Sequence, residues 1–323
     1  MPTADQVVDR VSRGKIPLTS KVLVTGVNGL LGRHLAFELV RRGFTVTGTI
    51  RDQNSLSGVR LPDSVRLICS GSLGANTDWS AAIDGVSHVF HTAAHVHVRH
   101  PSNLDRQLFR EVNVEASARL AGQCRDVGVG RLIFVSSAAV YSSELTDYGR
   151  SKIDAEQAIE QQLRGSGTGW VVVRPPMIYG PSGRGSFARL DQLVRSRIPL
   201  PIASLKSKRS LISVFNLVDF LIHLVNAPGV EGAAWPVADG PAVETVELFR
   251  QIARARSINL REWRLSPELI GSTLRWLGRG DDADRLLNSF ELNIEETLRS
   301  TGWRARWSLG EGVRMCVRSR VAD

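Results

Sequence analysis

Strand-like and helix-like segments alternate along the first half of this chain, and this alternation limits the possible folds more than any other feature. The strand-like segments are short and rich in β-branched residues, whereas the segments between them place apolar residues at helical spacing. Leu132-Ile133-Phe134-Val135 is apolar throughout, as expected for a strand buried on both faces. We therefore predict an α/β fold, a doubly wound parallel sheet with helices on both faces. The predicted strands are 22–24, 45–50, 65–69, 86–91, 131–136 and 170–174, and the predicted helices are 30–42, 79–83, 104–127 and 148–163.

The alternation ends after Arg174, where closely spaced prolines and glycines interrupt it. We predict a dinucleotide-fold domain over residues 20–176 and a smaller C-terminal lobe over 177–323, with the stretch 210–240 returning to the first domain. Residues 1–19 are polar and charged without an apolar core, so we interpret them as an N-terminal extension rather than a secretory signal. After Arg174, helices are predicted at 187–197, 218–226, 246–255 and 294–300.

A glycine-rich turn, Thr25-Gly26-Val27-Asn28-Gly29-Leu30-Leu31-Gly32, joins the first predicted strand to the first predicted helix. Gly26 permits the tight turn, Gly29 lets backbone N–H groups approach a pyrophosphate, and Gly32 allows the helix to pack closely on the strand. The helix N-terminus adds unpaired donors and partial positive charge. Because spacing, strand and helix agree, the turn predicts a Rossmann-type dinucleotide site. We expect cofactor contacts from Gly26, Asn28, Gly29, Leu30, Leu31 and Gly32.

The end of the second predicted strand distinguishes NAD from NADP. An acidic residue there usually holds the ribose 2′-hydroxyl of NAD, whereas a basic residue accommodates the 2′-phosphate of NADP. The strand ends in Ile50, followed by Arg51 and Asp52. Arg51 could stack on adenine and pair with a 2′-phosphate, so we favour NADP. NAD is the alternative, because Asp52 could turn inward and hold the ribose.

Tyr148 and Lys152 lie four residues apart, on one face of a predicted helix, and Ser136 and Ser137 end a buried strand. Ligands of a doubly wound sheet collect at the carboxyl ends of its strands. Oxidising a carbinol requires a group that takes the hydroxyl proton, and tyrosine does so only when its pKa falls from about 10 toward neutrality. An ammonium about 4 Å away contributes on the order of 4 kcal/mol at an effective dielectric of about 20, or roughly three pKa units. We predict Tyr148 as the acid/base, Lys152 as its pKa shifter and ribose anchor, and Ser137 as the hydroxyl that holds the substrate oxygen.

These features together resemble the extended short-chain dehydrogenase/reductase family, and within it the nucleotide-sugar epimerase/dehydratase branch. The resemblance runs from about Lys21 to Val313. The motifs that carry it are the glycine turn, Val89-Phe90-His91-Thr92-Ala93-Ala94, Val112-Asn113-Val114, Val135-Ser136-Ser137-Ala138, Tyr148-x-x-x-Lys152, Arg174-Pro175-Pro176, Tyr179-Gly180-Pro181, Arg209–Val214 and Gly302-Trp303.

The resemblance implies further site residues. Ser137 rather than Ser136 matches the catalytic hydroxyl, and Asn113 matches a helix asparagine near the active site. Arg209 matches the arginine that grips the substrate pyrophosphate, for which a guanidinium fork is well suited. Cofactor contacts are expected from Ser72, Leu73, Ala93, Ala94 and Pro175, in addition to Tyr148 and Lys152, and substrate contacts from His97, Arg184 and Ser137.

The resemblance also implies the reaction. We expect NADPH-dependent 4-keto reduction of a UDP-linked 6-deoxy-N-acetylhexosamine in bacterial surface-polysaccharide synthesis. A UDP-sugar 4-epimerase with retained NAD uses the same residues and is the alternative. A non-catalytic, cofactor-sensing regulator is the distant third interpretation, because such proteins often lose the Tyr or Lys, and this chain has both.

Composition excludes several other classes. The net charge of +9 comes mostly from scattered arginines without interleaved aromatic residues, which argues against a nucleic-acid partner. Three widely spaced cysteines form neither a disulfide framework nor a metal motif, and His95 and His97 lack a third ligand, so we expect no metal. No stretch is apolar enough for a membrane span. We expect a cytoplasmic protein, with a homodimer as the candidate assembly.

Overall fold

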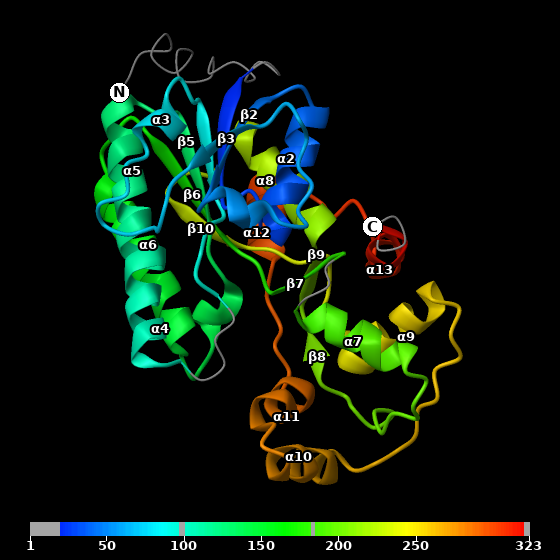
Figure 1. The fold of residues 1–323 in the computed structure, drawn as a ribbon. Helices are drawn as coiled ribbons and strands as arrows, with labels where there is room; N and C mark the ends of the chain where they lie inside the picture. The colour runs from blue at the N-terminus through cyan, green and yellow to red at the C-terminus, as the bar shows by residue number, and fades with distance from the viewer. Residues whose placement is uncertain (1–19, 97–100, 182–184, 320–323) are drawn as a thin grey trace, which may run out of the picture.

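The computed structural model describes residues 20–96, 101–181 and 185–319. The described chain forms two lobes, which are both seen in Figure 1: a layered lobe built around a sheet, and a smaller lobe of short helices and strand pairs below it. Two apolar clusters lie in the sheet lobe, one on each face of the sheet, and a third lies mainly in the smaller lobe.

Seven strands form the central sheet in the order β10-β6-β5-β4-β1-β2-β3, and all of their pairings are parallel. This confirms the predicted doubly wound parallel sheet. The chain turns from one half of the sheet to the other between β1 and β4, so the carboxyl ends of these two strands mark the switch point where ligands collect in such folds. The strands are β1 (Lys21–Thr25), β2 (Thr45–Ile50), β3 (Arg66–Cys69), β4 (His88–His91), β5 (Arg131–Val135), β6 (Gly169–Arg174) and β10 (Ala233–Pro236).

Helices cover both faces of the sheet because successive side chains of each strand point to opposite sides. In β1, Val22 and Val24 enter the apolar core shared with α2 and α8, whereas Leu23 enters the core on the other face. Leucine, isoleucine and alanine residues of α5 and α6 complete that second core. The helices of this lobe are α2 (Leu30–Arg41), α3 (Ser80–Ile83), α4 (Asn103–Leu108), α5 (Ala116–Val127), α6 (Asp147–Leu163), α8 (Val214–Asn226) and α12 (Glu295–Thr301).

The helix predicted over 104–127 is interrupted. Between α4 and α5 the chain forms a π-helix, η2 (Phe109–Glu115), with Asn113 buried on its inner side. Apolar periodicity does not reveal such a change, because a π-helix adds only one residue to a turn. π-Helical turns are frequent at functional sites, since the wider turn redirects a side chain and a carbonyl.

The smaller lobe packs around two short strand pairs, β7 with β9 and β8 with β11. Within the stretch 210–240, α8 packs on the sheet and β10 extends its edge, next to β6. None of the described helices is long and apolar enough to cross a membrane. The remaining elements are β7 (Met177–Tyr179), β8 (Lys208–Arg209), β9 (Leu211–Ser213), β11 (Val243–Glu244), α7 (Ser186–Arg195), α9 (Thr245–Ala255), α10 (Pro267–Trp276), α11 (Gly280–Leu287) and α13 (Leu309–Ser319), with the 3₁₀ turns η1 (Gln53–Leu56) and η3 (Ala138–Tyr141).

Candidate active site

The glycine turn lies between the carboxyl end of β1 and the first turn of α2, whose first two residues are Leu30 and Leu31. Gly26 has a φ of +64°, and a Cβ there would lie 2.9 Å from the Cα of Ala93. A Cβ at Gly32 would lie 2.4 Å from the carbonyl oxygen of Gly26, so only glycine lets α2 pack this closely on the turn. Gly29 is exposed, and a Cβ there would meet only the carbonyl oxygen of Gly26, at 3.3 Å. The turn therefore fits a dinucleotide pyrophosphate, which the free N–H groups at the start of α2 would bind.

The loop after β2 is tied to this turn. Asn28 donates from Nδ2 to the carbonyl oxygen of Ser55 at 3.0 Å, and Asp52 accepts from the backbone N–H of Ser55 at 2.9 Å. The Asp52 carboxylate thus caps η1, while Arg51 is exposed and has no ion-pair partner among the residues that the structure describes. Ser72 and Leu73 follow β3 at the same edge of the sheet.

The segment after β4 is held against β1 by two hydroxyls, and the first is that of Thr92, which donates to the carbonyl oxygen of Thr25 at 2.6 Å. Thr25 Oγ1 accepts from the backbone N–H groups of Thr92 and Ala93, each at 3.1 Å. Ala93 and Ala94 are half-buried and lie where the chain leaves the switch point. Their small side chains leave room beside the glycine turn, as expected for a segment that passes along a bound dinucleotide.

The structure brings Ser137 and Tyr148 together from two different elements. Ser137 follows β5 and begins η3, where its Oγ accepts from the N–H of Ala139 at 3.1 Å. Tyr148 lies in the first turn of α6, which Thr146 caps through the N–H of Gly149. Burial raises the pKa of Tyr148, and a side-chain hydrogen bond with Ser137 acts in the opposite direction. A hydroxyl pair of this kind can hold one substrate oxygen between a proton acceptor and a donor.

Lys152 lies one turn further along α6 and is only 2% exposed. Its Nζ donates to the carbonyl oxygen of Val135 at 3.0 Å and lies 4.6 Å from the ring centre of Phe134. Burial lowers the pKa of Lys152 to about 8, although the carboxylate of Glu156 raises it. At neutral pH the side chain is therefore still an ammonium, held in a place of low dielectric where its charge acts strongly on its neighbours.

The side chain of Ser136 bonds to Glu156 and not to Tyr148. Its Oγ donates to the carboxylate of Glu156, which also forms an ion pair with Arg174. The side chain of Ser136 therefore belongs to a buried polar cluster behind the site, and Ser137 is the serine that faces Tyr148. Pro175 lies beside it, since its carbonyl oxygen accepts from the N–H of Ala138 at 2.8 Å.

Asn113 links the π-helix to α6. Its Nδ2 donates to Ser151 Oγ at 3.0 Å and to the carbonyl oxygen of His95 at 3.1 Å, and its Oδ1 accepts from the N–H of His95 at 2.7 Å. The asparagine thus fixes the segment after β4 against α6 in the turn between Tyr148 and Lys152.

The sequence alone assigned no role to His91, which is fully buried at the end of β4. Its Nδ1 bonds with Thr25 Oγ1 at 2.7 Å and its Nε2 with Ser117 Oγ at 2.8 Å. Burial lowers its pKa to about 3, with a smaller effect from the charge of Lys152, so the ring is neutral. His91 thereby connects the cofactor side of the site with α5. The available signal was a histidine that ends the strand directly after Val89 and Phe90.

Of the residues predicted to contact the substrate besides Ser137, the structure describes only Arg209, and this side chain bonds to the segment around α11. Arg209 donates from its guanidinium to the carbonyl oxygens of Arg285 at 2.7 Å and Asn288 at 3.2 Å, at the C-terminal end of α11. His97 and Arg184 lie outside the described residues.

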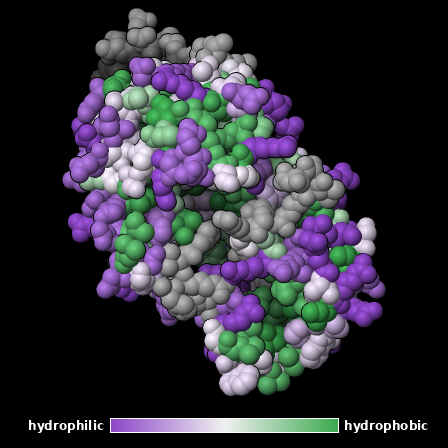
Figure 2. All heavy atoms as spheres, viewed as in Figure 1, coloured by the Kyte–Doolittle hydropathy of each residue, from purple (hydrophilic) through white to green (hydrophobic). Residues whose placement is uncertain are grey.

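His95 bonds with Asp105, and no group of three potential metal ligands occurs within the described ranges. Figure 2 shows a hollow in the molecular surface between the two lobes, on the face viewed there.

A parallel doubly wound sheet, a glycine turn at its switch point and a Tyr-x-x-x-Lys helix beside it define an enzyme of the short-chain dehydrogenase/reductase type. Comparison with known proteins identifies the family. The model of the NAD dependent epimerase/dehydratase family matches residues 22–238, and the chain belongs to this family.

The relatives agree with this assignment. The UDP-glucose 4-epimerase of Vibrio cholerae is 30% identical over 95% of this chain and 97% of its own length. Among solved structures, the UDP-glucuronic acid 4-epimerase of Bacillus cereus in complex with NAD covers 93% of this chain and 99% of its own, with a TM-score of 0.73 at 16% identity. MoeE5 in complex with UDP-glucuronic acid and NAD covers 94% of this chain and 100% of its own, with a TM-score of 0.72 at 24% identity.

Proposed function

We propose that this enzyme is an NAD-retaining 4-epimerase of a UDP-sugar. The observation that carries the proposal is the pairing of Tyr148 with Ser137 at the same sheet edge as the glycine turn. The buried ammonium of Lys152 lies one turn further along α6 and bonds to Val135, two residues before Ser137. This arrangement suits reversible proton transfer at a secondary hydroxyl. The similarity to the Vibrio cholerae UDP-glucose 4-epimerase over nearly the whole chain supports a UDP-sugar as the substrate.

Each residue has one task in this proposal. Tyr148 takes the proton of the sugar C4 hydroxyl and later returns it, while Ser137 holds the same oxygen. The charge of Lys152 stabilises the phenolate of Tyr148 and so offsets the effect of burial, which raises the pKa of that phenol. The glycine turn from Gly26 to Gly32 would hold NAD, which would supply reversible hydride transfer at C4 of the sugar. Arg209 would bind the pyrophosphate of the substrate only after its guanidinium leaves the carbonyls of α11.

A specific observation favours NADPH-dependent 4-keto reduction as the second candidate function. Arg51 is exposed at the end of β2 without an ion-pair partner in the described part of the chain, and Asp52 is engaged as the cap of η1. An exposed guanidinium here suits a 2′-phosphate. The family model and the NAD complexes of the two structural neighbours favour NAD instead.

One experiment separates the two candidates. The purified protein is incubated with UDP-glucose or UDP-N-acetylglucosamine without added cofactor, and in parallel with UDP-4-keto-6-deoxy-N-acetylglucosamine and NADPH. Interconversion of C4 epimers without added nucleotide, together with NAD released on denaturation, is the result that we expect. Consumption of NADPH without epimer formation would establish the reductase. Turnover in neither arm would reject these UDP-sugars as substrates, and Tyr148→Phe serves as the inactive control.

A further inference from the structure

A cavity of about 460 Å³ lies outside the site described above, between α2 and α8, with the C-terminal segment 303–307 along one side. Its lining includes Phe37 and Val40 of α2, Phe215 and Val218 of α8, and Trp307. The glycine turn precedes the first residue of α2, whereas Phe37 comes seven residues later. At 1.5 Å per residue Phe37 is therefore about 10 Å further along the helix than the turn, and His34, the lining residue of α2 nearest to the turn, is about 6 Å further. The cavity is a separate place on the molecule.

Aromatic rings form the wall of this cavity. The rings of His34 and Phe215 meet edge to face with centres 5.7 Å apart, and those of Phe215 and Trp307 do the same at 6.3 Å. Phe37 contributes a further ring and is 48% exposed. Covering this ring with an apolar ligand would remove apolar surface from water and so lower the free energy. The cavity thus offers the apolar faces and edges that a flat apolar molecule can contact.

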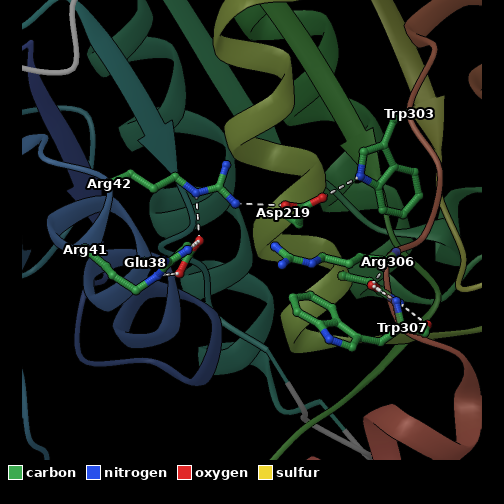
Figure 3. Close-up of polar contacts among 8 residues, drawn as sticks. Glu38, Arg41, Arg42, Asp219, Trp303, Arg306 and Trp307 are labelled. Carbon is green, nitrogen blue, oxygen red and sulfur yellow. Dashed lines mark hydrogen bonds and ion pairs between the residues drawn. The ribbon is translucent and has the colours of Figure 1, made fainter.

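The acidic groups at the cavity are already neutralised. Glu38 accepts from Arg41 at 2.6 and 2.7 Å and from Arg42 at 2.7 Å, and these arginines lower its pKa. Asp219 accepts from Arg42 at 2.8 Å and from Trp303 Nε1 at 3.0 Å. Figure 3 shows this chain of contacts running from α2 across α8 to the C-terminal segment. A cationic ligand would find both carboxylates engaged.

Arg306 takes no part in the ion pairs between Glu38, Arg41, Arg42 and Asp219. Its guanidinium lies 5.0 Å from the ring centre of Trp307, and it has no carboxylate partner among the described residues. In Figure 3 the side chain of Arg306 extends from the C-terminal segment toward α2. Arg41 and Arg42 balance the charges of Glu38 and Asp219, and Arg306 adds one further positive charge. Arg306 is exposed and does not itself line the cavity, but its guanidinium lies against the ring of Trp307, which does, so this charge stands at the rim of the cavity.

We propose that this cavity binds a small amphiphilic carboxylate, with its flat apolar body between Phe37 and Trp307 and its carboxylate on Arg306. The aromatic wall supplies the apolar contacts, and the guanidinium supplies a charge-assisted pair of hydrogen bonds that a neutral ligand cannot form. The excess of one positive charge selects an anion over a cation. This binding site does not depend on the reaction catalysed at Tyr148.

Calorimetric titration with 2-naphthoate at low salt tests the proposal, and 2-naphthalenemethanol is the neutral probe of matched shape. We expect 2-naphthoate to bind at least tenfold more tightly than the alcohol. Arg306→Gln should abolish this preference, and Phe37→Ala should weaken both probes at least threefold. Equal binding of the two probes, or an unchanged preference in Arg306→Gln, would overturn the proposal.

Two controls make the result specific. Arg164→Gln and Leu104→Ala remove an exposed arginine that follows α6 and an exposed apolar side chain of α4, away from the cavity, and should leave the affinity for 2-naphthoate unchanged. Arg306→Gln and Phe37→Ala should retain the unfolding temperature of the wild type, which shows that they fold. Saturating NAD should not displace 2-naphthoate; full displacement would place the probe in the cofactor site and reject the proposal.

Discussion

Lys152 donates a hydrogen bond of 3.0 Å from Nζ to the carbonyl oxygen of Val135, the last residue of β5. The next two residues along the chain are Ser136 and Ser137, so this bond fixes α6 against the strand that leads to Ser137. Because Lys152 is buried, its position is set by the fold and not by side-chain freedom. A displacement of β5 relative to α6 would separate the hydroxyl of Ser137, which follows β5, from the phenol and the ammonium, which both lie on α6.

Replacing Tyr148 with Phe should lower kcat by about 10² to 10⁴, because the proton acceptor is lost while the ring and its packing against Phe109 are kept. Cofactor affinity should change less than threefold. Turnover and cofactor titration of the variant measure these effects. Tyr141→Phe is the matched control, since Tyr141 is exposed and bonds with Arg174 outside the site. Retention of more than a tenth of the wild-type turnover would show that Tyr148 is not the acid/base.

Replacing Lys152 with Met should alter the pH dependence of stability. The pKa of Lys152 is about 8 in the folded chain, against an ordinary lysine value of 10.5, so between these values the unfolded chain binds more protons. The free energy of unfolding of the wild type should therefore rise with pH through this window, by up to about 3 kcal/mol. Lys152→Met should lack this rise and be inactive. Denaturant unfolding at pH 7.5 and 10.5 provides the measurement, and parallel curves for the two proteins would contradict it.

Replacing His91 with Phe should make the protein less sensitive to acid. The folded pKa of about 3 lies below the ordinary histidine value of 6.5, so the wild type loses stability as pH falls from 6.5 toward 3, by up to about 5 kcal/mol. At pH 7 the variant should be less stable by about 1–3 kcal/mol, because Thr25 and Ser117 each lose a hydrogen-bond partner. Unfolding curves at pH 7 and pH 5 test both effects. An equal loss in the two proteins between these pH values would argue against a neutral His91.

Alanine substitutions in the glycine turn should separate folding from cofactor binding. Gly32→Ala places a Cβ 2.4 Å from the Gly26 carbonyl oxygen and should destabilise the fold by several kcal/mol. Gly29→Ala meets only the Gly26 carbonyl oxygen at 3.3 Å, so its stability should stay within about 1 kcal/mol of the wild type. Its affinity for NAD should nevertheless fall at least tenfold, since the methyl group enters the space for the pyrophosphate. Normal NAD affinity in Gly29→Ala would place the dinucleotide elsewhere.

Several elements could be predicted because their signals are local. The strands near 22–24, 131–136 and 170–174 and the helix near 148–163 all occur in the structure within a few residues of the predicted ends. Buried parallel strands are apolar throughout, and helices flanking them carry an apolar stripe, so both leave a pattern in adjacent residues. By contrast, the sequence patterns predict none of α10, α11 and α13, and they do not distinguish the π-helix η2 from a continuous α-helix.

The sequence by itself determined the sheet fold and the glycine turn, and it led to the prediction of Tyr148, Lys152 and Ser137 as the site, because backbone sterics and the spacing of residues along one helix depend only on near neighbours in the chain. The tertiary structure alone decided that Ser136 is engaged by Glu156, that His91 bridges Thr25 and Ser117, and that Arg209 rests on the carbonyls of α11. Each of these contacts joins residues at least 20 positions apart. A hydrogen bond between such residues exists only once the packing of whole elements has brought their atoms within about 3 Å.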